Sequence, residues 1–292
     1  MYKLKSMTCK SALHKLKRNM PYSHDLNLYK GCSHNCIYCY ARYADKFKPE
    51  GGDAHTIYAK VNIAKVLEKD LSKLGGGRHV INLGGVTDAY QEAEKTAKLM
   101  RAVLKVLIKY KTPIVISTKS NLLLRDLDLI EELASVTDVN IVASVSTVDD
   151  SLAKILEPGA VSPQKRMEMI SEVSKKTKAM TGIHLFPVLP AITDGYEEVE
   201  NVYQLAYEMN PDYFMIATLY LRGETRGYYL EQVKKHFPSL YSQTLRLYHN
   251  GKLDATYKKQ FYERIQPIRD KYKFKMTAEE AIEYLRTGQL RL

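Results

Sequence analysis

The chain has 292 residues, 45% of them hydrophobic and 26% charged, which is the composition of a folded globular protein and excludes general disorder. No apolar run approaches the roughly 18 residues of a membrane helix, so we expect a soluble protein. Lys and Arg number 44 against 33 Asp and Glu, a net charge of +11, and six of the basic residues lie in a basic N-terminal arm, residues 1–24. This surplus is either a solvated surface or an attraction for an anionic partner such as nucleic acid.

The predicted elements follow this arm and alternate between strands and helices. β-Branched runs bounded by turn residues indicate strands, and apolar residues three or four apart indicate helices. In chain order we predict strand 25–31, helix 62–74, strand 79–85, helix 92–110, strand 113–118, helix 123–136, strand 140–146, helices 149–156 and 163–179, strand 183–189, helix 196–209 and strand 213–221. From about residue 227 onward the chain is expected to be helical, with a turn at Asn250-Gly251.

Repeated strand–helix units without hairpin signals predict a parallel sheet with helices packed outside it. Six units are too few for a closed eight-stranded barrel but suit an open one. The fold class is therefore α/β, a partial (β/α)6 barrel with a helical C-terminal extension, and residues 25–292 are expected to form one domain. The apolar stripe in helix 92–110 is interpreted as core; it consists of Leu99, Met100, Val103, Leu104 and Leu107.

The chemistry of such a barrel lies at the C-terminal ends of its strands. In this sequence those ends carry small hydroxyl residues, one lysine and a cluster of cysteines. The residues at these ends are 32–39, Thr87-Asp88, Thr118-Lys119-Ser120, Ser144, Ser146 and Thr147, His184 and Pro187, and Thr218 and Tyr220. Their convergence on one edge predicts a polar ligand site beside the cysteines.

Three of the four cysteines lie within eight residues, in the spacing C-x-x-x-C-x-x-C of Cys32, Cys36 and Cys39. Such crowding does not suit a disulfide framework, so we expect a metal or cluster site in a reducing compartment, the cytoplasm. Thiolates bind zinc or iron–sulfur clusters. Structural zinc needs a fourth protein ligand, from Cys9, His34 or a distant histidine, whereas a 4Fe–4S cluster held by three thiolates leaves one iron open to another ligand.

This motif resembles that of the radical S-adenosylmethionine (SAM) superfamily, and further stretches resemble its spore photoproduct lyase-related, DNA repair photolyase-like group. The similar stretches are NLYKGCSHNCIYCYAR (27–42), GVTDAYQEAE (85–94), STKSNLLLRDLDLI (117–130), SVSTVDD (144–150), LEPGA with PQKRMEMI (156–170) and FPVLPAITDG (186–195). The resemblance covers about residues 20–240.

The resemblance implies a 4Fe–4S cluster on Cys32, Cys36 and Cys39, with SAM bound to its open iron. Reductive cleavage of SAM would give a 5′-deoxyadenosyl radical that abstracts a hydrogen atom from a substrate. A flavodoxin or ferredoxin would supply the electron.

The resemblance also carries individual roles onto residues of this sequence. Around the SAM molecule, the resemblance implies Tyr38 against the adenine and Ser144 near the ribose. At the methionine part it implies Gly84, Gly85 and Thr87 at the amine and Lys119 at the carboxylate. Arg166 is expected to bind a further anionic group unless it is a helix-surface arginine, and Asp88 is expected to bind the cofactor in a role that is open. Tyr38 and Tyr40 match the tyrosines of the lyase's hydrogen-transfer path and are the expected catalytic residues.

One departure concerns the returned hydrogen atom. The lyase uses a cysteine near the end of the second strand, where Gly85 stands in this sequence, and the one spare thiol, Cys9, lies in the basic arm. Repair by the lyase's route would therefore require Cys9 to fold over the barrel opening.

Three functions stay open at this point. The first is a radical SAM enzyme acting on nucleic acid or another anionic substrate, for which the charge and the 22 tyrosines, among them Tyr229 and Tyr248, leave room. The second is a radical SAM enzyme acting on a small metabolite or a peptide. The third is a non-catalytic protein that binds zinc and nucleic acid.

Overall fold

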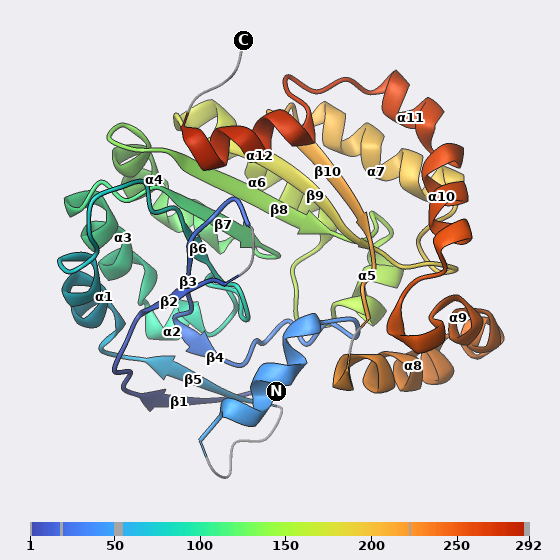
Figure 1. Cartoon of the computed structure of the whole chain (residues 1–292), viewed down its shortest axis with the longest axis horizontal. Coiled ribbons are helices and arrows are strands. Elements are labelled where there is room, and N and C mark those ends of the chain that lie inside the picture. Colours follow the sequence, from blue (N-terminus) through green and yellow to red (C-terminus); the bar gives the residue numbers. More distant parts are fainter. Residues whose placement is uncertain (1, 18–19, 50–54, 222, 289–292) are drawn as a thin grey trace.

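The computed structural model describes residues 2–17, 20–49, 55–221 and 223–288, and its centre is a sheet of six parallel strands. Each of these strands neighbours the next one along the chain, so the sheet curls as a partial barrel (Figure 1). The six are β3 (His24–Leu26), β6 (Ile81–Leu83), β7 (Ile114–Thr118), β8 (Val139–Val145), β9 (Met180–Val188) and β10 (Tyr213–Thr218). A short strand, β2 (Leu13–Lys15), adds to β3 in the antiparallel direction.

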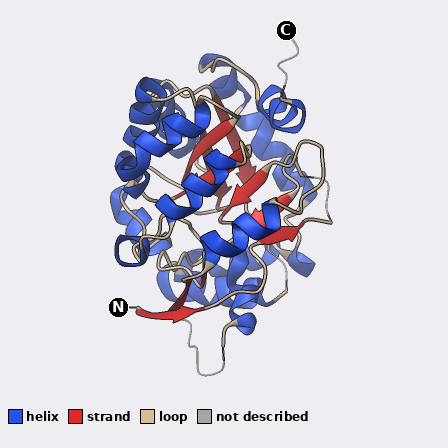
Figure 2. Cartoon of the chain, turned by 90° about the vertical axis from the view of Figure 1, so that its left-hand side faces the viewer, coloured by secondary structure: helices blue, strands red, loops and turns tan. Residues whose placement is uncertain are grey.

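Helices cover the outer face of this sheet, as Figure 2 shows, and the predicted partial (β/α)6 architecture is confirmed. They are α1 (Ile63–Leu71), α2 (Glu94–Ala97), α3 (Met100–Lys109), α4 (Leu127–Ala134), α5 (Asp150–Leu156), α6 (Pro163–Lys176) and α7 (Tyr196–Glu208), with a 3-10 turn, η2 (Leu122–Asp126), before α4. Among the helices of the described ranges, none has both the length and the apolar character that crossing a membrane requires.

The apolar stripe of α3 lies in the core, as predicted, but the helix is shorter than 92–110. Met100, Val103, Leu104 and Leu107 are fully buried. The backbone breaks at Lys98, whose φ is +51°, and divides the region into α2 and α3. The carboxylate of Glu94 accepts hydrogen bonds from the backbone N–H groups of Leu99 and Met100, both at 3.0 Å, and so provides the N-terminal cap of α3.

The predicted first strand, 25–31, is two strands in two different sheets. After β3 the chain leaves the barrel and forms β4 (Tyr29–Lys30), which pairs with β5 (Thr56–Lys60) in a three-stranded sheet completed by β1 (Lys3–Met7). Neither β1 nor β5 is among the predicted elements. This second sheet places residues 31–39 directly beside the C-terminal ends of the barrel strands (Figure 1).

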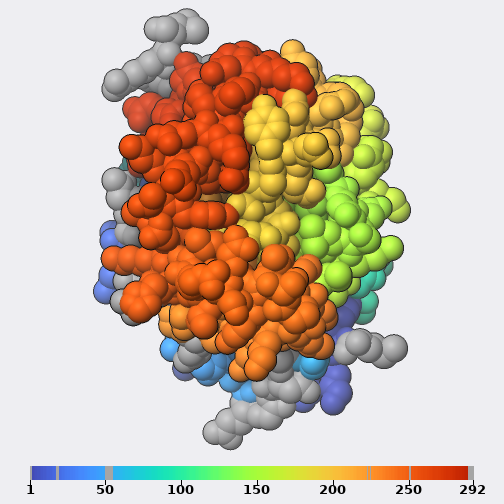
Figure 3. All heavy atoms as spheres, turned by 90° about the vertical axis from the view of Figure 1, so that its right-hand side faces the viewer, coloured from blue at the N-terminus to red at the C-terminus, as the bar shows by residue number. Residues whose placement is uncertain are grey.

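The C-terminal region is helical, as predicted, and packs along one side of the molecule (Figure 3). It consists of α8 (Glu224–His236), η3 (Pro238–Leu240), α9 (Tyr241–Leu247), η4 (His249–Gly251), α10 (Ala255–Arg264), α11 (Gln266–Lys271) and α12 (Ala278–Thr287). In α12, Ala281 and Leu285 pack against Val115, Val142 and Tyr213 of the sheet. This helix therefore covers the barrel away from the strand ends that carry the cysteines.

We expect Leu104→Ala to lower the free energy of unfolding by about 2–5 kcal/mol, because it leaves a cavity in the core. Leu245→Ala is the matched control: the same atoms are removed from a side chain that is 39% exposed, so a change within about 0.5 kcal/mol is expected. Urea unfolding followed by circular dichroism measures both. Equal losses in the two variants would contradict the assignment of α3 to the core.

Candidate active site

The three clustered cysteines lie in a loop, residues 31–39, between β4 and a 3-10 helix, η1 (Tyr40–Phe47). Cys36 is buried, while Cys32 and Cys39 are partly buried, and all three are free thiols. The loop has no regular structure, so other segments satisfy its backbone groups. The N–H of Ile37 donates to the carbonyl of Leu156 at 2.9 Å, and the N–H of Gly159 donates to the carbonyl of His34 at 3.0 Å.

The start of this cysteine loop is held by the segment that follows β6. The Thr87 hydroxyl donates to the Gly31 carbonyl at 2.7 Å, and the Gln91 amide donates to the same oxygen at 3.2 Å. Gln91 also accepts a hydrogen bond from the N–H of Ser33 at 2.7 Å and is fully buried. The sequence assigned no role to Gln91; the available signal was its place in the stretch 85–94.

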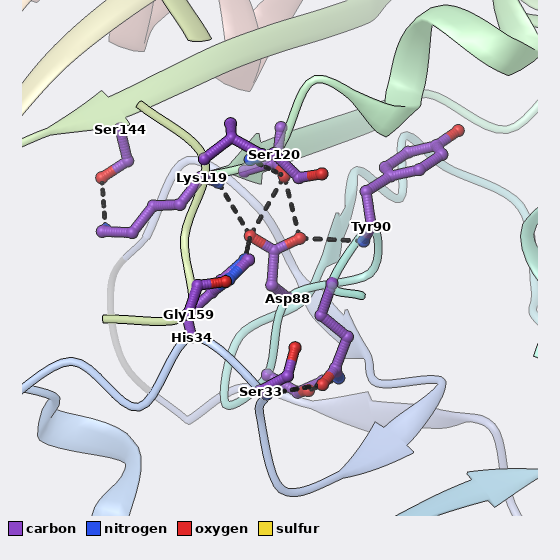
Figure 4. A network of polar contacts seen from close by, with 12 residues as sticks. Ser33, His34, Asp88, Tyr90, Lys119, Ser120, Ser144 and Gly159 are labelled. Carbon is purple, nitrogen blue, oxygen red and sulfur yellow. Dashed lines mark hydrogen bonds and ion pairs between the residues drawn. The ribbon is translucent and has the colours of Figure 1, made fainter. Parts of the chain in front are cut away.

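Asp88 forms the centre of a buried polar network (Figure 4). Its carboxylate contacts His34 Nε2 at 2.9 Å and accepts from the N–H groups of Lys119 and Tyr90, both at 2.8 Å, and from the Thr118 hydroxyl at 2.9 Å. Burial raises the pKa of this carboxyl, but His34 and the backbone donors outweigh it and hold the pKa below its ordinary value. Asp88 thus joins the cysteine loop to the end of β7, and these protein donors already surround its carboxylate.

Lys119 and Ser144 stand side by side at the ends of β7 and β8, as predicted from their places in the sequence. The Lys119 ammonium donates to the Ser144 hydroxyl at 2.9 Å and lies 5.8 Å from the centre of the Tyr38 ring. Ser144 in turn donates to the carbonyl of Phe186 at 3.3 Å. The structure therefore gathers one cation, one hydroxyl and one aromatic ring next to the cysteines.

Below this cation the barrel interior contains a neutral histidine. His184 Nε2 lies 3.3 Å from the Tyr213 hydroxyl. Burial, with a further effect from Lys119, lowers the pKa of His184 to about 3, so its imidazole is uncharged near pH 7. His184 was predicted only as a strand-end residue.

A buried acid, Glu157, was missed by the sequence reasoning, although it lies in the stretch 156–160. The Tyr38 hydroxyl donates to it, and Arg166 Nη1 lies 2.5 Å from its second oxygen. Lys119 Nζ lies 4.0 Å away. Burial raises the pKa of Glu157, but Arg166 and Lys119 outweigh it and hold the pKa below its ordinary value of 4.5. Burial and this carboxylate raise the pKa of Tyr38, so its phenol stays protonated.

Arg166 is not a helix-surface residue, because only 1% of it is exposed. Besides Glu157, its guanidinium donates to the carbonyls of Ser144 and Val161, at 2.9 and 2.8 Å. The arginine supports the end of β8 and neutralises the buried acid.

The two glycines after β6 allow close backbone approaches. Gly84 has a φ of +94°, a conformation that side chains rarely adopt. A Cβ on Gly85 would lie 2.5 Å from the carboxylate of Asp25, which accepts from the Asn82 amide at 2.8 Å. The Tyr40 hydroxyl donates to the carbonyl of Gly85, which places this half-exposed tyrosine at the rim of the site.

Cys9 lies at the far end of the second sheet. It follows β1, whose last residue pairs with the last residue of β5, and it is hydrogen-bonded to Asn62 in both directions at 2.8 and 2.9 Å. The cysteine loop begins near the other end of β5, because Gly31 packs against Thr56, the first residue of that strand. Five strand residues span about 13 Å, so Cys9 does not lie over the barrel opening.

The donor set of the cysteine loop fits an iron–sulfur cluster. Burial raises the pKa of Cys32 to about 12 and those of Cys36 and Cys39 above their ordinary value, so the thiols need a bound cation to ionise. Within the described ranges, no three His, Cys, Asp or Glu side chains are arranged to hold a single metal ion. The three thiolate ligands of a cubane bind different iron atoms and need not converge on one point.

We compared this chain with protein families, with individual proteins and with solved structures. The model of the radical SAM superfamily matches residues 26–206. An uncharacterised protein of Mycobacterium tuberculosis is 34% identical over 273 residues, 91% of this chain and 79% of that protein. One of Methanocaldococcus jannaschii is 32% identical over 173 residues, 58% of this chain and 61% of that protein.

The fold is shared with a solved structure, spore photoproduct lyase complexed with dinucleoside spore photoproduct. The TM-score is 0.70 at 13% sequence identity, over 94% of this chain and 81% of that one.

We expect Glu157→Gln to destabilise the protein by about 3–5 kcal/mol at pH 7, because it leaves the buried Arg166 charge without its partner. Glu172→Gln, which breaks an exposed pair with Lys176, is the control and should leave the free energy of unfolding close to that of the wild type. Because the folded pKa of Glu157 lies below 4.5, its contribution is complete above that pH and is lost as the pH falls further. Unfolding in urea at pH 7 and pH 3 measures this, and a loss that is equal at both pH values would contradict it.

Proposed function

This chain belongs to the radical SAM superfamily, and on that premise we propose that it cleaves SAM reductively at a 4Fe–4S cluster and uses the resulting 5′-deoxyadenosyl radical to take a hydrogen atom from a nucleic acid or another anionic substrate. The observation that carries this proposal is the position of the cysteine loop, beside Lys119 and Ser144 at the C-terminal ends of the barrel strands. When bound, the cluster supplies the electron that splits the sulfonium of SAM.

The residues of this chain have separate tasks in the proposal. Cys32, Cys36 and Cys39 would hold the cluster. Lys119 would donate to the carboxylate of the methionine part, since its ammonium is already held at the strand ends by Ser144. The remaining contacts proposed for SAM are those of Tyr38, Gly84, Gly85, Thr87, Ser144, Arg166 and Asp88. Of these, Arg166, Thr87 and Asp88 already bond to protein groups, so we place them in support of the binding surface.

Tyr40 is the residue that we propose for hydrogen transfer with the substrate. Its hydroxyl lies at the carbonyl of Gly85, the position at which the lyase has its hydrogen-donating cysteine. Tyr38 is proposed in the same path, with Glu157 as the acceptor of its phenolic hydrogen bond. The position of Cys9 supports a tyrosine over a thiol in this role.

Exposed aromatic side chains and the net charge of +11 support a nucleic-acid substrate. Tyr40, Tyr43 and Phe47 of η1 are 54%, 43% and 58% exposed, and Tyr220 is 56% exposed. Exposed rings can stack on bases, and basic side chains can bind phosphates. By contrast, Tyr229 and Tyr248 are fully buried and belong to the core. The lyase that shares this fold is complexed with a dinucleoside photoproduct, a ligand of the same class.

The proposal includes an electron donor and a location. A flavodoxin or ferredoxin would deliver the low-potential electron, and the free thiols suit the reducing cytoplasm.

The first test is formation of 5′-deoxyadenosine. Protein reconstituted with iron and sulfide under anaerobic conditions, then given SAM and dithionite, should release it, and Cys32, Cys36 and Cys39 replaced together by alanine should abolish release. Cys9→Ala is the matched control and should leave release unchanged, because this thiol lies outside the loop. A loaded cluster that neither binds SAM nor cleaves it would overturn the proposal.

The second test concerns the substrate. If about three lysine or arginine side chains contact phosphates, the logarithm of the affinity for single-stranded oligonucleotides should fall with the logarithm of salt concentration at a slope of about −2. Fluorescence anisotropy from 50 to 300 mM salt measures it. A flat response would favour a small metabolite or a peptide instead.

A further inference from the structure

Three residues outside the cysteine loop hold it in place by hydrogen bonds. They come from two segments that are far from the loop in the sequence: Asp88 and Gln91 lie after β6, and Gly159 lies after α5. Because the loop has no regular structure, groups of the barrel supply the hydrogen-bond partners that its backbone lacks.

His34, which stands between Cys32 and Cys36, is the centre of this attachment. Its Nδ1 lies 3.0 Å from the carbonyl oxygen of Gly159 and its Nε2 lies 2.9 Å from Asp88. The two ring nitrogens thus contact a backbone carbonyl oxygen and a carboxylate, which belong to two different segments of the barrel. The side chains of His34 and Asp88 are both buried, so water does not compete for the contact between them.

Gly159 is in contact with the backbone of the loop itself. A Cβ added to this glycine would lie 1.9 Å from the carbonyl oxygen of Ser33 and 3.0 Å from the Cα of His34. Both are backbone atoms, which cannot turn away as a flexible side chain can. Any residue other than glycine would push the cysteine loop away from the α5–α6 connection.

Asp88 connects the same attachment to Lys119. The carboxylate that contacts His34 also accepts from the N–H of Lys119 and from the hydroxyl of Thr118. One side chain, that of Asp88, thus links the loop directly to the backbone of Lys119 (Figure 4).

We propose that His34, Asp88 and Gly159 form a clamp that holds the cysteine loop in its ligand-binding conformation before any cluster is present, and that Asp88 sets the distance between this loop and Lys119. The clamp residues are positioning residues, since they act through the cysteines and the lysine. A loop that is ordered in advance binds its ligand without losing conformational freedom at that moment. The second half of the proposal rests on the proposed function, whereas the first half does not.

Hydrogen–deuterium exchange of the cluster-free protein tests the first half. We expect the loop amides of residues 33–39 to be protected in the wild type and to exchange at least tenfold faster in Gly159→Ala, with the core strands unchanged. Gly75→Ala is the matched control, because nothing lies within 4 Å of its added methyl group and it is expected to change nothing. Where Gly159→Ala does not fold, His34→Gln replaces it. Unprotected loop amides in the wild type, or unaltered exchange in the variant, would overturn the clamp.

Asp88→Asn tests the second half, because it replaces one acceptor oxygen by a donor in a site surrounded by donors. We expect iron and sulfide per chain to fall at least twofold after reconstitution, and the change that SAM causes in the electron paramagnetic resonance spectrum of the reduced cluster to be altered. Asp70→Asn is the control; that carboxylate holds residues 11–13 by comparable hydrogen bonds away from the site, so both readouts should stay as in the wild type.

The outcomes separate the two proposals. A normal SAM-dependent spectrum in Asp88→Asn overturns the role given to Asp88 while the proposed function stands. A wild-type protein that binds no cluster, yet shows protected loop amides, overturns the proposed function and the role of Asp88 but supports the clamp.

Discussion

The cysteine loop is a buried segment without regular structure, and much of the structure around it satisfies its backbone groups. A buried N–H or carbonyl without a partner costs roughly as much as a lost hydrogen bond, and this loop has no helix or sheet of its own to supply the partners. The partners come from the barrel: Gln91 and Thr87 bond to its first residues, Leu156 and Gly159 to its middle. The segments after β6 and α5 are therefore shaped as much by the loop as by the sheet.

Three buried carboxylates in the segments between the barrel strands each have a matching set of donors. Asp88 bonds to the loop and to β7, Glu157 to Tyr38 and Arg166, and Glu94 to Arg125 at 2.7 Å and to the first turn of α3. Each acid joins segments that lie at least 30 residues apart, and burial makes each contact intolerant of a missing partner. These buried carboxylates therefore fix the positions of the loops relative to one another, whereas the apolar faces of the helices pack against the sheet.

The sequence was informative where local patterns decide the structure. The periodic stripe of α3 and the alternation of strands and helices were sufficient for the partial barrel. The sequence also indicated that Cys32, Cys36, Cys39 and Lys119 come together near the strand ends, and their role there stays a prediction. The sequence was uninformative where a residue far away along the chain determines the local structure or the role of a side chain. Glu94 breaks the expected helix 92–110 because its carboxylate caps α3, and Glu157 and Gln91 resemble ordinary polar loop residues until Arg166 and the cysteine loop are placed against them. The predicted strand 25–31 is divided because its second part, β4, pairs with β5 in a second sheet that also contains β1.

The contact between Gly85 and Asp25 has a consequence for how this barrel can change over evolutionary time. A side chain at position 85 would overlap a carboxylate that is itself held by Asn82, so the Asp25 side chain would have to give up this hydrogen bond or be replaced. Positions 25 and 85 are thus coupled, and the residues that position 85 can accept over time depend on the residue at position 25.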